Sequence, residues 1–313
     1  MTLAMLVPSQ AAGTNLIFVS NEKSHEVVVL NADYEIVKRI ETSRRPRDMH
    51  FNADRTLLYL ACGDNDIIDI IDISSLEVVD SIPTGPSPEV FAFSPDESRI
   101  YVSNEEDSRL EVIDAASRIS IAEVATGAEP EGVIATPDGT TVYVTSEVAD
   151  MVHVVDVATS AVTKNILVGT RPRRFALTPD DTELWVSAEL SSEVYVIDRA
   201  TNEVKDVLEY IPPGFRLEDV TPVGIEITKD GSKALVSLGR ANHIAVVDVA
   251  TKEVLEYVLV GRRAWSVALN RDDTIAIVAN GLSDDITVVD MGSLKAIKSV
   301  PVGRVPHTVL IDD

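Results

Sequence analysis

The sequence is short of several residue types, and each shortage excludes a class of protein. Its single cysteine, Cys62, cannot form an internal disulfide, so burial and hydrogen bonding must stabilise the fold. No apolar run approaches the roughly 20 residues that a membrane-spanning helix needs, so we expect no membrane insertion. Basic residues are scarce too, since 27 Lys and Arg stand against 51 Asp and Glu. The resulting net charge of −24 argues against nucleic acid as a partner.

Familiar catalytic motifs are absent as well. The chain contains no GxSxG, HExxH, Walker or dinucleotide-binding glycine motif, and no pair of histidines has the spacing of a zinc or copper site. What remains, 45% hydrophobic and 25% charged residues, is the composition of an ordinary soluble globular protein. We therefore assign no catalytic residue and favour a binding protein over an enzyme.

Residues 1–14 are expected to lie outside the fold. A short apolar run at 3–7 precedes Ser9-Gln10-Ala11, which resembles the end of a signal peptide, although no positively charged segment comes before it. Two interpretations stay open, the remnant of an export signal and a disordered N-terminus. In both, a single domain spans residues 15–313.

A repeat of about 42 residues organises this domain. Its first marker is a polar residue, usually Asp, after an apolar pair, and it recurs at Asn31, Asp72, Asp114, Asp156, Asp198, Asp248 and Asp290. The spacings are 41, 42, 42, 42, 50 and 42. A second marker with the same intervals opens a strand-like run at Phe18, Tyr59, Tyr101, Tyr143, Trp185, Leu235 and Ile277. Two independent markers with one period indicate seven similar units.

Each unit carries four β signals and no helical one. In the unit that begins at Pro88, alternating apolar residues predict strands A to D at 89–94, 99–104, 110–114 and 119–125. A Pro-Asp turn follows strand A in several units, and these aspartates, like those that end strand C, are expected to form turns.

Four short antiparallel strands repeated in this way predict an all-β fold, a seven-bladed β-propeller. The chain opens at Leu16 with strands B, C and D of one blade and ends at 305–312 with a lone strand A. Pairing these two ends would complete the seventh blade and close the ring.

The repeat also carries a resemblance. FVSN, YVSN and YVTS, with IPTGPSPEVFAFSPDESRIYVSN and VATGAEPEGVIATPDGTTVYVT, resemble the YVTN-type seven-bladed β-propellers. More narrowly, NEKSHEVVVL, RRPRDMHF, PSPEVFAFSPD, AEPEGVIATPD, RPRRFALTPD and TPVGIEITKDG resemble the propeller subfamily associated with alcohol catabolism that depends on pyrroloquinoline quinone (PQQ). The resemblance covers residues 15–313. It implies a periplasmic or secreted protein encoded near a quinone-dependent dehydrogenase, and no settled reaction.

The predicted strand order puts the D-to-A and B-to-C loops on one face, around the mouth of the central channel. Across the blades, the first position of strand A is Arg47, Glu89, Glu131, Arg173, Val223, Trp265 and His307. Arg263 lies in an adjoining loop. We predict that the channel mouth binds a ligand through these residues other than Val223, with charges in one sector and Trp265 and His307 in the opposite one.

The charged sector has three interpretations. Arg47 could pair with Glu89, and Arg173 with Glu131, in a structural collar. Alternatively, four carboxylates could hold a Ca²⁺-like or lanthanide cation, because such ions take several oxygen ligands; these are Glu89, Glu105, Glu131 and Glu147. A third interpretation gives the arginines to an anion such as PQQ itself, since guanidinium groups bind carboxylates in bidentate fashion.

Two further features break the repeat. The interval of 50 comes from extra residues around 210–219, which we interpret as a lid or docking edge at the mouth, or as a longer loop without function. His50 and Glu226 stand where other blades carry small or apolar residues, and both are expected to be hydrogen-bonded core residues.

These patterns support two classes of function. The first is a non-catalytic periplasmic propeller whose mouth binds a small ligand, a cation or a partner protein, such as the dehydrogenase, of a PQQ-dependent alcohol oxidation system. The second is a metal-assisted hydrolase or lactonase, in which the four glutamates hold a divalent ion that polarises a carbonyl.

Overall fold

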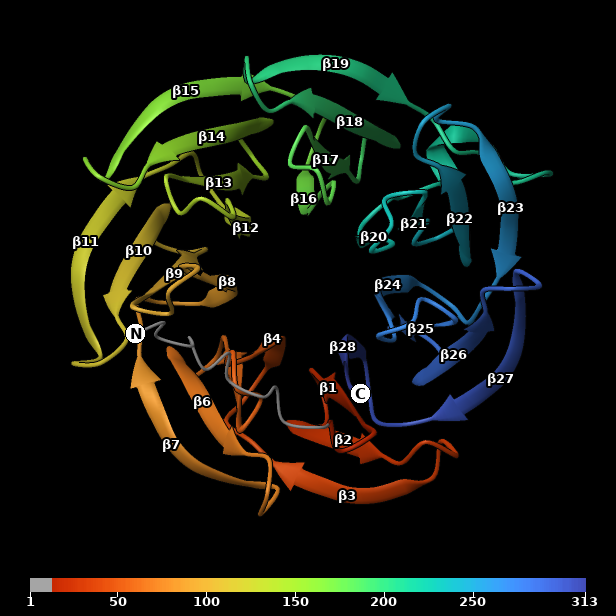
Figure 1. Ribbon diagram of the computed structural model, residues 1–313, viewed down its shortest axis with the longest axis horizontal. Coiled ribbons are helices and arrows are strands. Elements are labelled where there is room, and N and C mark those ends of the chain that lie inside the picture. Colours follow the sequence, from red (N-terminus) through yellow and green to blue (C-terminus); the bar gives the residue numbers. More distant parts are fainter. Residues whose placement is uncertain (1–12) are drawn as a thin grey trace, which may run out of the picture.

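Seven four-stranded antiparallel sheets surround a central channel in the computed structural model, which describes residues 13–313 (Figure 1). This arrangement confirms the predicted seven-bladed β-propeller. No helix in these residues is long and apolar enough to span a membrane.

Each blade contributes strands A to D from the channel outward (Figure 1). The innermost strands A are β4 (Pro46–Phe51), β8 (Pro88–Phe93), β12 (Pro130–Ala135), β16 (Pro172–Leu177), β20 (Ile225–Ile227), β24 (Ala264–Leu269) and β28 (Pro306–Asp312). Strands B are β5 (Leu57–Cys62), β9 (Arg99–Asn104), β13 (Thr141–Ser146), β17 (Glu183–Ala188), β21 (Lys233–Ser237), β25 (Ile275–Asn280) and β1 (Leu16–Asn21). Strands C are β6 (Ile67–Asp72), β10 (Arg109–Asp114), β14 (Met151–Asp156), β18 (Glu193–Asp198), β22 (His243–Asp248), β26 (Asp285–Asp290) and β2 (Glu26–Leu30). Strands D are β7 (Glu77–Pro83), β11 (Ile119–Ala125), β15 (Ala161–Leu167), β19 (Glu203–Leu208), β23 (Val254–Leu259), β27 (Lys295–Pro301) and β3 (Ile36–Glu41). In this order, the strands A define blades I to VII.

The two ends of the chain close the ring in blade VII. Strand β28 pairs antiparallel with β1, with Phe18 opposite Leu310 and Val19 opposite Val309. Beyond the strands, the Thr14 hydroxyl donates to Oδ2 of Asp312 at 2.6 Å, and Nε of Arg55 in blade I lies 2.6 Å from the other oxygen of that carboxylate. The closure predicted from the sequence is therefore present, and Asp312 also links it to blade I.

The hydrophobic core lies between neighbouring blades. Strands B and C are buried almost throughout, because each sheet packs one face against the blade before it and the other against the blade after it. One interblade cluster, for example, joins Phe18 and Val27 of blade VII to Met49, Leu58 and Leu60 of blade I. The outer strands D are mostly exposed, so they form the rim of the disk.

The repeated aspartates are turn residues, as predicted. Oδ1 of Asp96 accepts hydrogen bonds from the hydroxyls of Ser94 at 2.7 Å and Ser98 at 2.8 Å. These bonds lower the pKa of Asp96 to about 2. At the end of strand C, Asp114 accepts from the backbone N–H and the hydroxyl of Ser117 in the same manner.

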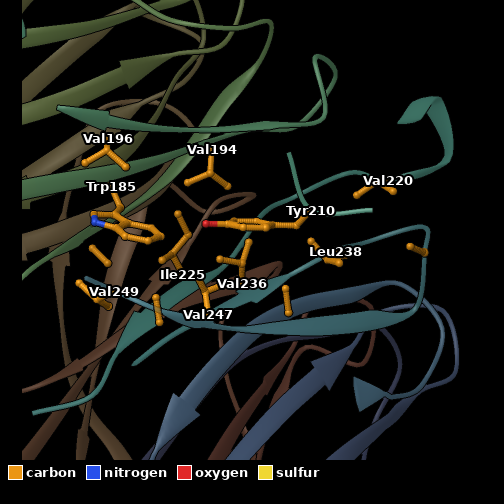
Figure 2. Close-up of a cluster of buried hydrophobic side chains, with 14 residues drawn as sticks. Trp185, Val194, Val196, Tyr210, Val220, Ile225, Val236, Leu238, Val247 and Val249 are labelled. Atoms are coloured by element: carbon orange, nitrogen blue, oxygen red, sulfur yellow. The ribbon is translucent and has the colours of Figure 1, made fainter. Parts of the chain in front are cut away.

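The insertion between β19 and β20 packs into the core rather than over the channel. It contains the short 3₁₀ helix η1 (Leu217–Asp219), and Tyr210 and Val220 on either side of that helix are at most 3% exposed. Figure 2 shows the Tyr210 ring among Val194, Ile225 and other apolar side chains of blades IV and V. The Phe215 ring contacts His243 of strand C of blade V, with centroids 5.5 Å apart. The lid interpretation is therefore wrong for this structure, because apolar side chains attach the insertion to blade V.

Deleting residues 305–313 should abolish cooperative folding, since it removes strand A from blade VII and exposes the edge of β1. Circular dichroism melts of the truncated and full-length chains would measure this. A synthetic peptide of residues 305–313 should restore part of the transition, and an unchanged melt of the truncated chain would contradict the closure.

Tyr210 offers a test of the insertion's anchoring. Its hydroxyl is buried without a hydrogen-bond partner in the part of the chain that the structure describes. Tyr210→Phe should therefore leave stability unchanged or raise it by about 1 kcal/mol, whereas Tyr210→Ala should cost about 3–5 kcal/mol. Urea unfolding of both variants provides the comparison, and equal losses would show that the ring does not anchor the insertion.

Candidate functional site at the channel mouth

A bulge at the start of strand A directs side chains into the channel. In blade I, Pro46 pairs with Cys62 and Met49 with Leu60, so two residues of strand A stand opposite one residue of strand B. The same shift occurs in blades II, III, IV, VI and VII. A bulge bends the strand and re-aims its side chains. The first bulge position is the ring predicted from the sequence, from Arg47 through to His307.

A hydroxyl on strand B holds most of these bulges in place. In blade II, the Ser103 hydroxyl accepts from the N–H of Val90 at 3.1 Å and donates to the carbonyl of Glu131 in blade III at 2.6 Å. The equivalent residues that also donate to the next blade are Ser20, Thr145, Ser187 and Ser237. Each hydroxyl therefore links its blade to the next, and in blades II, III, IV and VII it also fixes the bulge.

Two blades lack this hydroxyl and are linked in other ways. Blade VI has Ala279 at the position, and Ser266 on strand A donates instead to the carbonyl of His307 in blade VII at 2.6 Å. Blade I has Ala61, and there Asp48 accepts from the N–H of Phe91 in blade II at 3.3 Å.

The D-to-A loops and the B-to-C loops surround the ring, and the two kinds of loop are hydrogen-bonded to each other through their backbones. The N–H of Glu105 donates to the carbonyl of Ser87 at 3.0 Å, and the N–H of Glu189 donates to that of Arg171 at 2.9 Å. The residue before strand A has a left-handed backbone in six blades, at Arg45, Ser87, Glu129, Arg171, Arg263 and Val305. Residues of these types have little intrinsic preference for this conformation. The hydrogen bonds to the paired loop maintain it.

Glu89 occupies one half of a network of arginine and glutamate pairs that we call the collar. The collar consists of Arg45, Arg47, Arg171, Arg173, Arg174 and Arg263 with Glu22, Glu89, Glu105, Glu131, Glu147 and Glu189. Glu89 lies 2.7 Å from Nη2 of Arg45 and 2.8 Å from Nε of Arg47. Burial raises the pKa of its carboxyl to about 8, and the two arginines oppose this shift.

Glu131 is the centre of the other half. Its Oε1 lies 3.3 Å from Arg47, 3.3 Å from Arg173 and 3.2 Å from Arg174. Burial would raise the pKa of Glu131, but these guanidinium groups outweigh it and lower the pKa to about 2. Arg173 also pairs with Glu147. The predicted pairs Arg47–Glu89 and Arg173–Glu131 are thus both present, within a larger network.

The sector with Trp265 and His307 is joined to the collar instead of lying apart from it. The guanidinium carbons of Arg173 and Arg263 each lie 4.9 Å from the centroid of the Trp265 ring. Nη2 of Arg174 lies 3.3 Å from Nε2 of His307 across the channel. Burial and then the neighbouring arginines lower the pKa of His307 well below its ordinary value, so its imidazole is neutral. The expected separation into a charged and an uncharged sector is therefore wrong.

The four glutamates predicted as cation ligands have arginine partners. Arg45 and Arg47 pair with Glu89, and Arg45 also lies 3.6 Å from Glu105. Glu131 and Glu147 pair with Arg173. Within residues 13–313, no group of three or more His, Cys, Asp or Glu is placed to hold a metal ion. The geometry of this mouth therefore suits paired charges rather than a shared cation.

Sequence reasoning missed the contribution of three kinds of residue. Glu189 pairs with Arg263 at 2.6 Å but was not among the predicted site residues. Arg174, at the second bulge position, reaches both Glu131 and His307. The Ser or Thr after YV in the repeat, such as Ser103, supports the bulges. The recurring Ser or Thr can be seen in the sequence, whereas the bulge that its hydroxyl supports cannot.

The ring of seven blades and its charged mouth define the class of protein, a seven-bladed β-propeller with a charged channel mouth. Sequence comparison gives the family. The family described as "Lactonase, 7-bladed beta-propeller" matches residues 81–211 and 122–310. The chain therefore belongs to this lactonase-type propeller family. No curated protein matches the sequence.

Solved structures resemble the chain at low sequence identity. Hydrazine synthase from Kuenenia stuttgartiensis is 18% identical with a TM-score of 0.80, over 93% of this chain and 99% of that one. The dihydro-haem d1 dehydrogenase NirN is 17% identical with a TM-score of 0.72, over 98% of this chain and 77% of that one. A Bacteroides uniformis protein provisionally named 6-phosphogluconolactonase is 14% identical with a TM-score of 0.79, over 95% and 98%. At these identities the similarity shows a shared fold.

Replacing Glu131 by Gln should destabilise the protein by about 3–5 kcal/mol near neutral pH, because three buried arginines lose a shared carboxylate. The loss should shrink in acid. The folded pKa of about 2 lies below the ordinary value of 4.5, so the stabilisation is complete above pH 4.5 and disappears as the pH falls towards 2. Urea unfolding of both proteins at neutral pH and at about pH 3 would measure the difference.

Glu89→Gln is the matched control for this experiment. Its carboxyl has a raised pKa, so at neutral pH the substitution removes less negative charge and should cost less than Glu131→Gln. A Glu131→Gln loss that stays the same at both pH values would show that ionisation of Glu131 does not stabilise the ring.

Proposed function

We propose that this protein is a non-catalytic binding propeller whose channel mouth takes a small planar polycarboxylate of the PQQ class. The observation that carries the proposal is the position of Trp265 beside two guanidinium groups, those of Arg173 and Arg263, at 4.9 Å each. The two guanidinium groups lie over this ring, which holds them in place, and their N–H groups are bidentate donors to the carboxylates of a planar anion. The indole N–H of Trp265 is buried and has no partner among the described residues, so it is free to donate to a ligand.

The charge pattern favours an anion over a cation. The glutamates of the collar already have guanidinium partners, so a metal ion would have to displace arginines. An incoming carboxylate could instead share guanidinium groups at the solvent-facing edge, where the side chain of Arg171 is 42% exposed and that of Arg45 is 20% exposed. Raised protonation of Glu89 would further reduce the negative charge of the collar.

The biological setting rests on the sequence resemblance to PQQ-associated propellers. It suggests a periplasmic protein that serves a quinone-dependent alcohol oxidation system, either by holding the quinone or by docking the dehydrogenase through the same face. Insertion residues such as Arg216 and Glu218, whose side chains are 80% and 69% exposed, would border that docking surface.

The second candidate is lactone hydrolysis, and the family match favours it. Water would add to the lactone carbonyl and the ring C–O bond would break, giving one hydroxy acid per water consumed. Such a reaction needs a base or an activated water, and His307 is the neutral imidazole of the mouth.

Calorimetric titration of the metal-stripped protein with PQQ, Ca²⁺ and a lanthanide at moderate salt tests the leading proposal. PQQ should bind, and Trp265→Leu or Arg263→Gln should weaken it by about tenfold or more, since each removes a stacking or charged contact. Arg118→Gln, a substitution on an exposed loop, should change nothing. Heat from the cations alone, or PQQ binding that tolerates both mouth variants, would contradict the proposal. Turnover of a simple lactone that is lost in His307→Gln would support the hydrolase instead.

A further inference from the structure

A second candidate site lies in the channel behind the collar. A cavity of about 400 Å³, which we call the channel cavity, begins at the second bulge position of strand A and extends to Arg55 in the loop between β4 and β5. It therefore reaches towards the face opposite the mouth. Most of its lining is apolar, with Phe51 and Phe175 among the larger side chains. A concave apolar space of this size suits a small organic molecule.

Five ionisable side chains interrupt the apolar lining, namely Asp48, His50, Arg55, Arg174 and Glu226. Arg55 is paired with the carboxylate of Asp312 and the carbonyl of Ile311. Asp48 and His50 satisfy each other, with Oδ2 and Nε2 2.9 Å apart. The pKa of His50 is raised, because burial lowers it but the charge and hydrogen bond of Asp48 outweigh burial. The prediction that His50 is hydrogen-bonded is thus confirmed. This pair is close to electrically neutral and leaves Arg174 and Glu226 to interact with a guest.

Arg174 is one of two arginines of the collar, with Arg263, that pair with a single carboxylate. Its one carboxylate is Glu131, whose Oε1 also faces Arg47 and Arg173. Its Nη1 is buried and has no hydrogen-bond partner in residues 13–313. Burial lowers the pKa of Arg174, with Glu131 and Asp48 opposing. A buried guanidinium N–H without an acceptor is costly, so an anionic group in the channel cavity would stabilise it.

Glu226 lies on strand A of blade V. The sequence predicted a hydrogen-bonded core residue, yet the described residues provide its side chain with no hydrogen bond or ion pair, and that prediction is wrong. Burial raises its pKa to about 7, with a smaller contribution from Asp273. A carboxyl in this state can donate its proton to an oxygen of a guest and adds little repulsion to a single negative charge.

We propose that the channel cavity is a second binding site, for a small monocarboxylate with an apolar body. The carboxylate binds Nη1 of Arg174, and the apolar body lies against Phe51 and Phe175. Arg174 is the guanidinium of the lining that has a buried N–H without an acceptor, whereas Arg55 is paired with Asp312, so the cavity balances one negative charge better than two. The cavity lining contains none of the residues at the first bulge position, such as Trp265, so this site is distinct from the mouth although Arg174 borders both.

Hexanoate is the probe, titrated calorimetrically into the full chain, with hexan-1-ol and inorganic phosphate as comparisons. Hexanoate should bind in a saturable way. Hexan-1-ol, which lacks the charge, and phosphate, which lacks the apolar body, should each bind about tenfold more weakly or worse. Absence of hexanoate binding, or equal binding of phosphate, would overturn the proposal.

Two variants locate the bound molecule. Arg174→Met should weaken hexanoate binding by about tenfold or more, but it also removes a collar contact. Ala268→Phe fills the channel cavity without altering a charge and should weaken binding equally. Arg118→Gln is the surface control and should have no effect. A folded Ala268→Phe protein that binds hexanoate like the wild type would overturn the proposal, while its PQQ titration tests the mouth separately.

Discussion

The bulge at the start of strand A, present in six of the seven blades, is the constraint on which the rest of the structure depends. A regular strand would send successive side chains alternately to its two faces, into the two blade interfaces. One extra residue in each of these six blades turns two consecutive side chains towards the axis. Side chains at the first of these positions contribute to the collar, and side chains at the second line the channel cavity at its end nearest the collar. Both candidate sites are therefore products of the same local irregularity.

The pairing of charges inside the collar follows from the close approach of these side chains at the axis. Side chains from blades I, III, IV and VII meet in a buried layer, and guanidinium groups such as Arg47 and Arg173 are almost fully covered. Buried charges are costly unless they are paired, so the glutamates and arginines must alternate in space although they lie far apart in the sequence. The network holds arginines and glutamates in equal number, and the one shared oxygen of Glu131 leaves Arg174 short of an acceptor. That shortage is what gives the channel cavity its binding chemistry.

Much of the fold could be predicted from the sequence because the repeat is regular along the chain. Two markers with one period determined seven blades, and the lone strand at 305–312 determined how they close. The residues of the ring could be aligned by the same count. The contacts that these residues make could not be predicted, because a contact such as that of Arg174 with His307 depends on how far a side chain extends across the channel. The position of the insertion was predicted wrongly for a related reason. Tyr210 becomes part of the core only when blades IV and V have folded and leave a space between them for its ring.

The joint between blades I and II differs from its neighbours. At the position of Ala61 the other joints have a serine or threonine, or a substitute in Ser266, whereas here the innermost links are Asp48 to the Phe91 N–H and Glu89 to Arg45 and Arg47. Uncharged hydroxyl bridges are indifferent to ionic strength, and charged ones are not. Salt and acidity therefore act more directly on this joint than on joints whose innermost link is a hydroxyl, although ion pairs such as Arg173–Glu131 and Arg55–Asp312 reinforce other joints.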